Sequence, residues 1–206
     1  MKHLAPIVLS LALSTLTAFP AAAQSMLAPG GPLDLSAPTV EKVLSVKVTV
    51  PAPVADVWKA WTTVEGLRTF FAPGAKVDYR TGGDYEIWFN PYAPVGTRGT
   101  DGMQILTMQE PRMLTFTWIA PPTQAAMRKQ VTYVTIRLRA VDAKNTELSL
   151  LHGGWGEGPE WDAYYASSEK TWKNTLSVLG HRFAKGPVDW TEIEAKLKAT
   201  APVMAK

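Results

Sequence analysis

The sequence predicts an α+β domain in which an antiparallel sheet wraps around one long C-terminal helix. First, apolar residues spaced three or four positions apart run from Trp161 to Phe183, which places them on one face of a helix. Second, several segments before this helix alternate between apolar and polar residues and are separated by turn signals, which is typical of consecutive antiparallel strands. A helix with such an aromatic face needs a large apolar surface to pack against, and this arrangement often leaves a cavity.

The ends of the long helix carry their own signals. Pro159 suits a first helical turn, and Glu160 and Asp162 place negative charge at the positive end of the helix dipole. Lys185 lies in the expected last turn, and Gly186 follows it as a stop signal. The sequence therefore predicts a helix from about residue 159 to residue 185.

Composition limits the class of protein. The chain has 206 residues, of which 46% are hydrophobic and 19% are charged, so it can form one globular domain with a substantial core. Its formal net charge is +3 with the basic residues scattered, so we predict no nucleic-acid partner. The sequence has no cysteine, which excludes disulfides, thiol nucleophiles and cysteine-bound metals. With only two histidines in the expected mature chain, we predict neither a metal site nor a cofactor.

The first 23 residues have the features of a signal peptide. Lys2 and His3 precede an apolar run from Ile7 to Phe19, and Ala21-Ala22-Ala23 provides a cleavage signal. Cleavage there would make Gln24 the new N-terminus. The apolar run is too short to span a bilayer, so we predict no stable membrane anchor. The expected location is periplasmic or extracellular.

The rest of the chain is expected to form one domain with flanking segments. Residues 24–40 are rich in proline and glycine and are predicted to be a linker. Residues 41–190 form the predicted domain, and residues 191–206 form a partly helical tail. Within the domain we expect short helices at 54–61 and 64–70, and strands at 44–50, 76–79, 85–89, 97–108, 114–118, 131–140 and 146–152.

Several motifs resemble a known superfamily. They are V-P-A-P-V-A-D-V-W-K-A-W-T-T at residues 50–63, G-G-D-Y at 82–85, P-R-M-L-T-F-T-W at 111–118 and T-E-L-S-L-L-H at 146–152. Together with the terminal helix, they resemble the START/birch-pollen-allergen-like (SRPBCC) superfamily, and within it the activators of the heat-shock-protein-90 ATPase. The resemblance covers roughly residues 41–186. It implies a helix-grip fold with a deep pocket between the sheet and the long helix.

Aromatic residues are the main candidates for a binding site. Tyrosine and tryptophan combine an apolar ring with a polar tip, which can orient a small ligand in an apolar pocket. For each single residue a role in the core is the commoner one. The predicted pocket residues are Trp58, Trp61, Phe71, Tyr85, Phe116, Trp118, His152, Trp161 and Tyr165.

His152 is also the one weak candidate for catalysis. Histidine titrates near neutral pH and can act as a general base, but a structural, hydrogen-bonded role is the favoured alternative. We therefore expect a non-enzymatic protein that binds a small hydrophobic or aromatic molecule. The alternatives are a polyketide-cyclase-like enzyme that uses His152, and a protein-interaction or chaperone-associated module.

Overall fold

The computed structural model describes residues 41–201. The predicted signal peptide and linker, residues 1–40, lie outside the described residues, as do residues 202–206 of the predicted tail. None of the helices in the described part has both the length and the apolar character that crossing a membrane requires.

The strands form one five-stranded sheet and one two-stranded ribbon, all antiparallel. The order in the larger sheet is β1-β7-β6-β5-β4, and β2 pairs with β3. This confirms the predicted antiparallel α+β class. The strands are β1 (Leu44–Val50), β2 (Gly74–Val77), β3 (Tyr85–Trp88), β4 (Ile105–Gln109), β5 (Met113–Trp118), β6 (Thr132–Ala140) and β7 (Thr146–Gly153).

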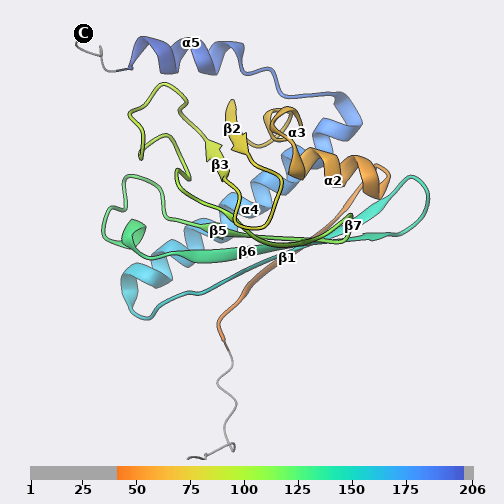
Figure 1. The fold of residues 1–206 in the computed structure, drawn as a ribbon, viewed down its shortest axis with the longest axis horizontal. Coiled ribbons are helices and arrows are strands. Elements are labelled where there is room, and N and C mark those ends of the chain that lie inside the picture. The colour runs from red at the N-terminus through yellow and green to blue at the C-terminus, as the bar shows by residue number, and fades with distance from the viewer. Residues whose placement is uncertain (1–40, 202–206) are drawn as a thin grey trace, which may run out of the picture. The chain divides into compact units, whose positions relative to one another are not determined.

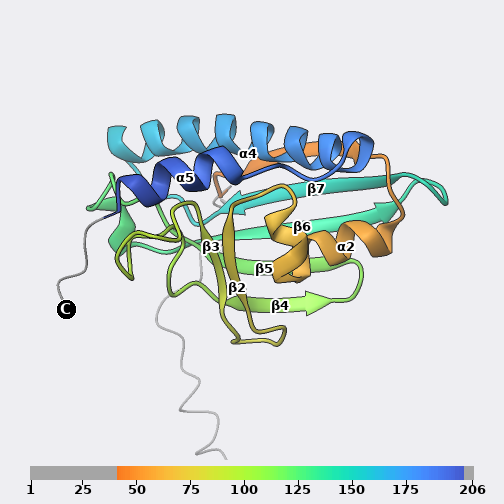
Figure 2. The same cartoon turned by 90° about the horizontal axis from the view of Figure 1, so that it is seen from above.

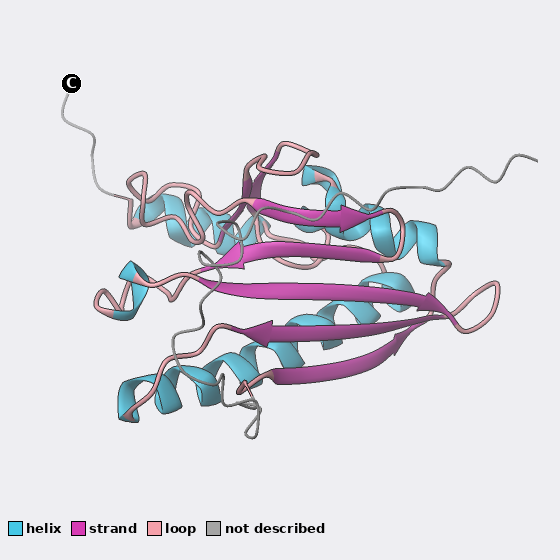
Figure 3. Cartoon of the chain, turned by 60° about the horizontal axis from the view of Figure 1, so that its bottom comes forward, coloured by secondary structure: helices cyan, strands magenta, loops and turns pink. Residues whose placement is uncertain are grey.

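The larger helices lie on one side of the sheet, and α4 runs along it (Figures 1 and 2). The opposite face of the sheet carries no helix of the described residues (Figure 3). This is the expected helix-grip arrangement. The helices are α2 (Val54–Thr62), α3 (Val64–Arg68), the short 3-10 helix η1 (Met127–Lys129), α4 (Pro159–Lys185) and α5 (Thr191–Ala199).

The predicted helical stripe is confirmed as the buried face of α4. Trp172, Leu176 and Leu179 are each at most 1% exposed and belong to the core formed against the sheet. In β1, Leu44 and Val50 are buried while the alternating polar residues are largely exposed. Apolar residues repeat about every 3.6 residues in the helix and every 2 residues in the strand, so each element has one apolar face. Both faces pack into the same core.

The long strand predicted over residues 97–108 is wrong for its first half, because only Ile105–Gln109 forms strand β4. The carboxylate of Asp101 accepts hydrogen bonds from the backbone N–H groups of Gly96 (3.1 Å) and Gly99 (3.0 Å). Gly102 has φ of +79°, a left-handed conformation that does not continue a strand. A side chain thus satisfies backbone groups that a sheet partner would otherwise bond.

Candidate ligand-binding site

Aromatic and aliphatic side chains pack together in the core between the sheet and the helices. Trp61, Phe71, Tyr85 and Phe116 are all buried, and their rings contact one another or their neighbours. The Tyr85 and Phe116 ring centroids are 4.5 Å apart, and the Tyr85 hydroxyl donates to the Trp61 carbonyl at 2.7 Å. These four predicted pocket residues therefore build a packed core.

His152 lies in the same core with both ring nitrogens engaged. The indole N–H of Trp172 donates to His152 Nδ1 at 3.1 Å, so Nδ1 is the acceptor and the proton sits on Nε2. Nε2 donates to the Thr132 hydroxyl at 2.8 Å, and that hydroxyl donates to the Trp118 carbonyl at 3.1 Å. The side chain is 0% exposed, and burial lowers the pKa of His152 from 6.5 to about 3. This neutral histidine links β7, α4 and β6, and it has no free nitrogen for a substrate.

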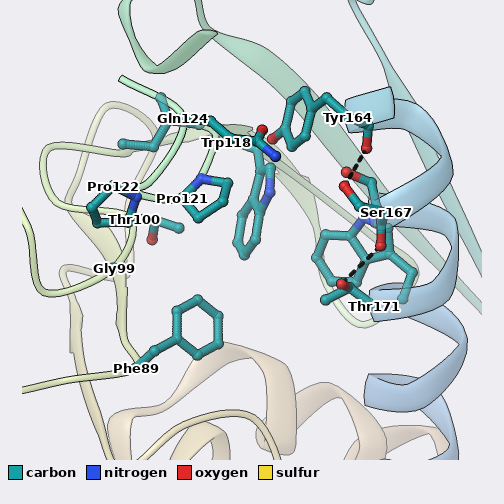
Figure 4. Close-up of a pocket in the computed structure, with 13 residues that line it drawn as sticks. Phe89, Gly99, Thr100, Trp118, Pro121, Pro122, Gln124, Tyr164, Ser167 and Thr171 are labelled. Carbon is teal, nitrogen blue, oxygen red and sulfur yellow. Dashed lines mark hydrogen bonds between the residues drawn. The ribbon is translucent and has the colours of Figure 1, made fainter. Parts of the chain in front are cut away.

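A cavity of about 240 Å³ lies at the end of this core, where β5 runs into the following loop. Figure 4 shows the ring of Phe89 on one side of it, Thr171 of α4 on another and the indole of Trp118 facing them. Ser167 and Thr171 are exposed residues of α4 and thus lie at its mouth. The lining consists of Phe89, Gly99, Thr100, Trp118, Ile119, Pro121, Pro122, Gln124, Tyr164, Ser167, Ser168, Thr171 and Trp172.

Two polar atoms of the cavity lining are buried without a hydrogen-bond partner in the described part of the chain. They are the hydroxyl of Tyr164 and Oε1 of Gln124. Burial raises the pKa of Tyr164 to about 12, and the nearby side chains of Ser168, Thr132 and Trp118 moderate this rise. None of the three meets the geometry of a hydrogen bond to the Tyr164 hydroxyl. The Tyr164 hydroxyl is therefore protonated at neutral pH and can both donate and accept.

An ionic cluster fixes the two loops that wall the cavity. The guanidinium of Arg128 donates to the carbonyls of Ala120 (2.6 Å) and Gly99 (2.7 Å), which joins the loop after β5 to the loop after β3. Arg98 binds Asp101 at 2.6 Å. Burial alone would raise the pKa of Asp101, but the hydrogen bonds from Arg98 and two backbone N–H groups hold it below its ordinary value. These contacts hold together the two loops that border the cavity.

The other predicted pocket residues lie elsewhere. Trp58 is beside a separate surface hollow, where its indole N–H donates to the Tyr79 hydroxyl at 3.1 Å. Trp161 lines another hollow near the start of α4, and Tyr165 packs against Trp155. Of the predicted pocket residues, only Trp118 lines the cavity between β5 and α4.

Three residues that line the cavity, Tyr164, Gln124 and Phe89, are not among the predicted pocket residues. Tyr164 belonged to the predicted helical stripe, so its burial was foreseeable. Nothing in the sequence pattern distinguished it from Tyr165, its neighbour in the same turn. Gln124 lies in a loop, where no periodicity marks the side that a residue faces. Phe89 alternates with Tyr85 and Ile87 in the sequence and directly follows the last residue of β3.

The cavity lining contains few groups that could take part in proton transfer. Its lining contains no histidine, carboxylate or lysine, and Tyr164 is its only ionisable side chain. General acid–base catalysis near pH 7 needs a group that titrates near that pH. Within residues 41–201, no group of three or more potential ligating side chains is placed to hold a metal ion.

Residues 51–184 match the family model described as Activator of Hsp90 ATPase homolog 1-like protein. The chain belongs to this family. The match confirms the resemblance seen in the sequence motifs, and it spans everything from the end of β1 to the last turn of α4. No match was found among curated proteins.

Solved structures show the same fold at low sequence identity. Protein MLL2253 from Mesorhizobium loti has a TM-score of 0.56 and 16% identity, covering 71% of this chain and 100% of its own. The Aha1 dimer from Colwellia psychrerythraea has a TM-score of 0.54 and 16% identity, and the match covers 70% of this chain and 98% of the Colwellia chain. An HSP90 activator from Plasmodium falciparum has a TM-score of 0.52 and 16% identity, and the match covers 71% of this chain and 97% of the Plasmodium chain. At these identities the likeness establishes the helix-grip fold alone.

Proposed function

We propose that this domain binds a small, mostly apolar molecule in the cavity between β5, α4 and the loops that follow β3 and β5. The observation that supports this function is the cavity itself. It is bordered by the rings of Phe89, Trp118 and Trp172, and Arg128 joins the two loops beside it. A cavity that stays open beside a tightly packed aromatic core is a feature of ligand sites, because unused space costs stability.

The size of the cavity limits the ligand to about one ring. Its volume is about 240 Å³. Apolar cavities of roughly 150 Å³ bind benzene, whereas sites for drug-sized ligands occupy about 300–1,000 Å³. The site that we propose is therefore smaller than the deep pocket that the family resemblance implies, and it lies at one end of the core.

The first test blocks the mouth of the cavity. Ser167→Trp places a large ring where an exposed residue lines the opening, so binding of one-ring compounds should be lost while the fold is kept. In the unaltered protein, a compound present at about 100 times its Kd should raise the free energy of unfolding by roughly 2.7 kcal/mol. This gain is measured as a rise in the melting temperature. Ser177→Trp is the matched control, because Ser177 is exposed on the same helix and does not line the cavity.

Stabilisation that survives Ser167→Trp unchanged would locate the binding elsewhere. If no one-ring compound stabilises the unaltered protein, the proposal fails. The protein-interaction alternative would then describe the domain better.

We also propose that the protein is exported and that the mature chain begins at Gln24. The support is the order of a basic start, an apolar run and the Ala21-Ala22-Ala23 cleavage signal. Intact-mass analysis of the protein from its native host should therefore show a chain that starts at Gln24 or within one or two residues of it. Recovery of the full-length chain from the cytosol would contradict export.

A further inference from the structure

We infer that the cavity selects a neutral one-ring molecule with an O–H or N–H donor, such as an alcohol or a phenol, and this inference rests on the proposed function. The inference is argued from a pair of unpartnered polar atoms in a mostly apolar lining. They are the hydroxyl of Tyr164 and Oε1 of Gln124.

Unpartnered buried polar atoms are rare in folded proteins because each costs about 1–3 kcal/mol. In the described part of this chain there are three such side-chain atoms, and two of them belong to the lining of this one cavity. Tyr164 is 3% exposed, so bulk water does not satisfy its hydroxyl. A bound molecule with matching polar groups would remove this cost.

The two atoms define what that molecule must offer. Oε1 of Gln124 can only accept, so its partner has to carry a donor. The Tyr164 hydroxyl can donate to or accept from the same ligand or another of its groups. A hydrocarbon satisfies neither atom.

A charged ligand is disfavoured by the rest of the lining. The cavity is lined by no lysine, arginine or histidine, so a carboxylate would be buried without a countercharge. Arg128 is close in the fold, but its guanidinium donates to the carbonyls of Ala120, Gly96 and Gly99. A neutral hydroxyl or amino group is the chemistry that fits.

The experiment compares a matched pair of probes, benzyl alcohol and toluene, by calorimetric titration. The readout is the ratio of the benzyl alcohol Kd to the toluene Kd. Tyr164→Phe and Gln124→Met should each raise this ratio by about 3- to 10-fold over the unaltered protein, the size expected for one neutral hydrogen bond. The Kd of toluene should change by less than about 2-fold, because toluene makes no hydrogen bond to either atom.

Tyr165→Phe is the matched control for Tyr164→Phe. It removes the same atom from the neighbouring tyrosine, which does not line the cavity, so the ratio should stay at the unaltered value. Tyr164→Phe should also fold normally without ligand, because it deletes a hydroxyl that has no partner.

The outcomes separate the inference from the proposed function. If both probes bind and the ratio is the same in every variant, the hydroxyl is not recognised, the two polar atoms are satisfied by retained water, and the inference fails while the proposed function stands. If neither probe nor any other one-ring compound binds the unaltered protein, the proposed function fails as well.

Discussion

Replacing Trp172 by alanine is expected to lower the free energy of unfolding by about 3–5 kcal/mol, the range for deleting a buried tryptophan ring. Trp172 is 1% exposed and packs against Trp118 with ring centroids 4.9 Å apart. The change also removes the N–H that His152 Nδ1 accepts. Urea unfolding of the two proteins measures the difference, and a loss this large is a substantial fraction of the stability of an ordinary domain.

Two further variants divide this effect into its parts. Trp172→Phe keeps a ring in the core but leaves His152 Nδ1 without a donor, so its cost should be smaller, about 1–3 kcal/mol. Lys173→Ala, at the exposed neighbouring position, should stay within about 0.5 kcal/mol of the unaltered protein. A loss below about 1 kcal/mol for Trp172→Ala would contradict the burial of this face of α4.

Mild acid is expected to destabilise the domain through His152. Burial lowers the pKa of His152 to about 3 in the folded protein, against 6.5 for an ordinary histidine. Between these two values the unfolded chain binds a proton that the folded chain does not, so the free energy of unfolding falls as the pH falls. Each pH unit below 6.5 costs about 1.4 kcal/mol, which gives a loss of about 2 kcal/mol at pH 5 relative to neutral pH.

His152→Gln provides the control for this pH dependence. A glutamine amide can accept from Trp172 and donate to Thr132 as the neutral imidazole does, but it does not titrate. The variant should lose less stability than the unaltered protein between pH 7 and pH 5, even if it is less stable at pH 7. Protonation of Asp101 affects the free energy of unfolding only at lower pH, because the pKa of Asp101 is held below the ordinary carboxylate value. If the free energy of unfolding falls equally with pH in the unaltered protein and in His152→Gln, His152 is not the titrating group.

The role of His152 depends on the tertiary structure and not on its place in the sequence. Its position at the end of a strand beside two glycines agreed with either a catalytic or a structural role. The structure gives it two hydrogen-bonded nitrogens and no exposed surface. His152 therefore offers no free nitrogen to a substrate, and for this reason the function that we propose for the cavity is binding.

Much of the architecture followed from periodicity in the sequence. The alternation in β1, β5, β6 and β7 and the stripe in α4 predicted each of these elements close to its observed bounds. Such patterns are reliable because a one-residue shift in a strand would turn its whole apolar set toward water. The predicted strand over residues 97–108 was partly wrong, since the bonds that Asp101 makes to nearby backbone groups leave no periodic signal.

The sequence by itself determined the fold class, the buried face of the long helix and the set of aromatic residues available for a site. Only the tertiary structure decided which of those residues fill the core and which border a cavity. Trp61, Tyr85 and Phe116 interlock with neighbours from other elements, whereas Trp118 is packed on one side and open on the other. The difference depends on how side chains from distant segments meet, and hydrophobicity alone, being non-directional, does not specify those contacts.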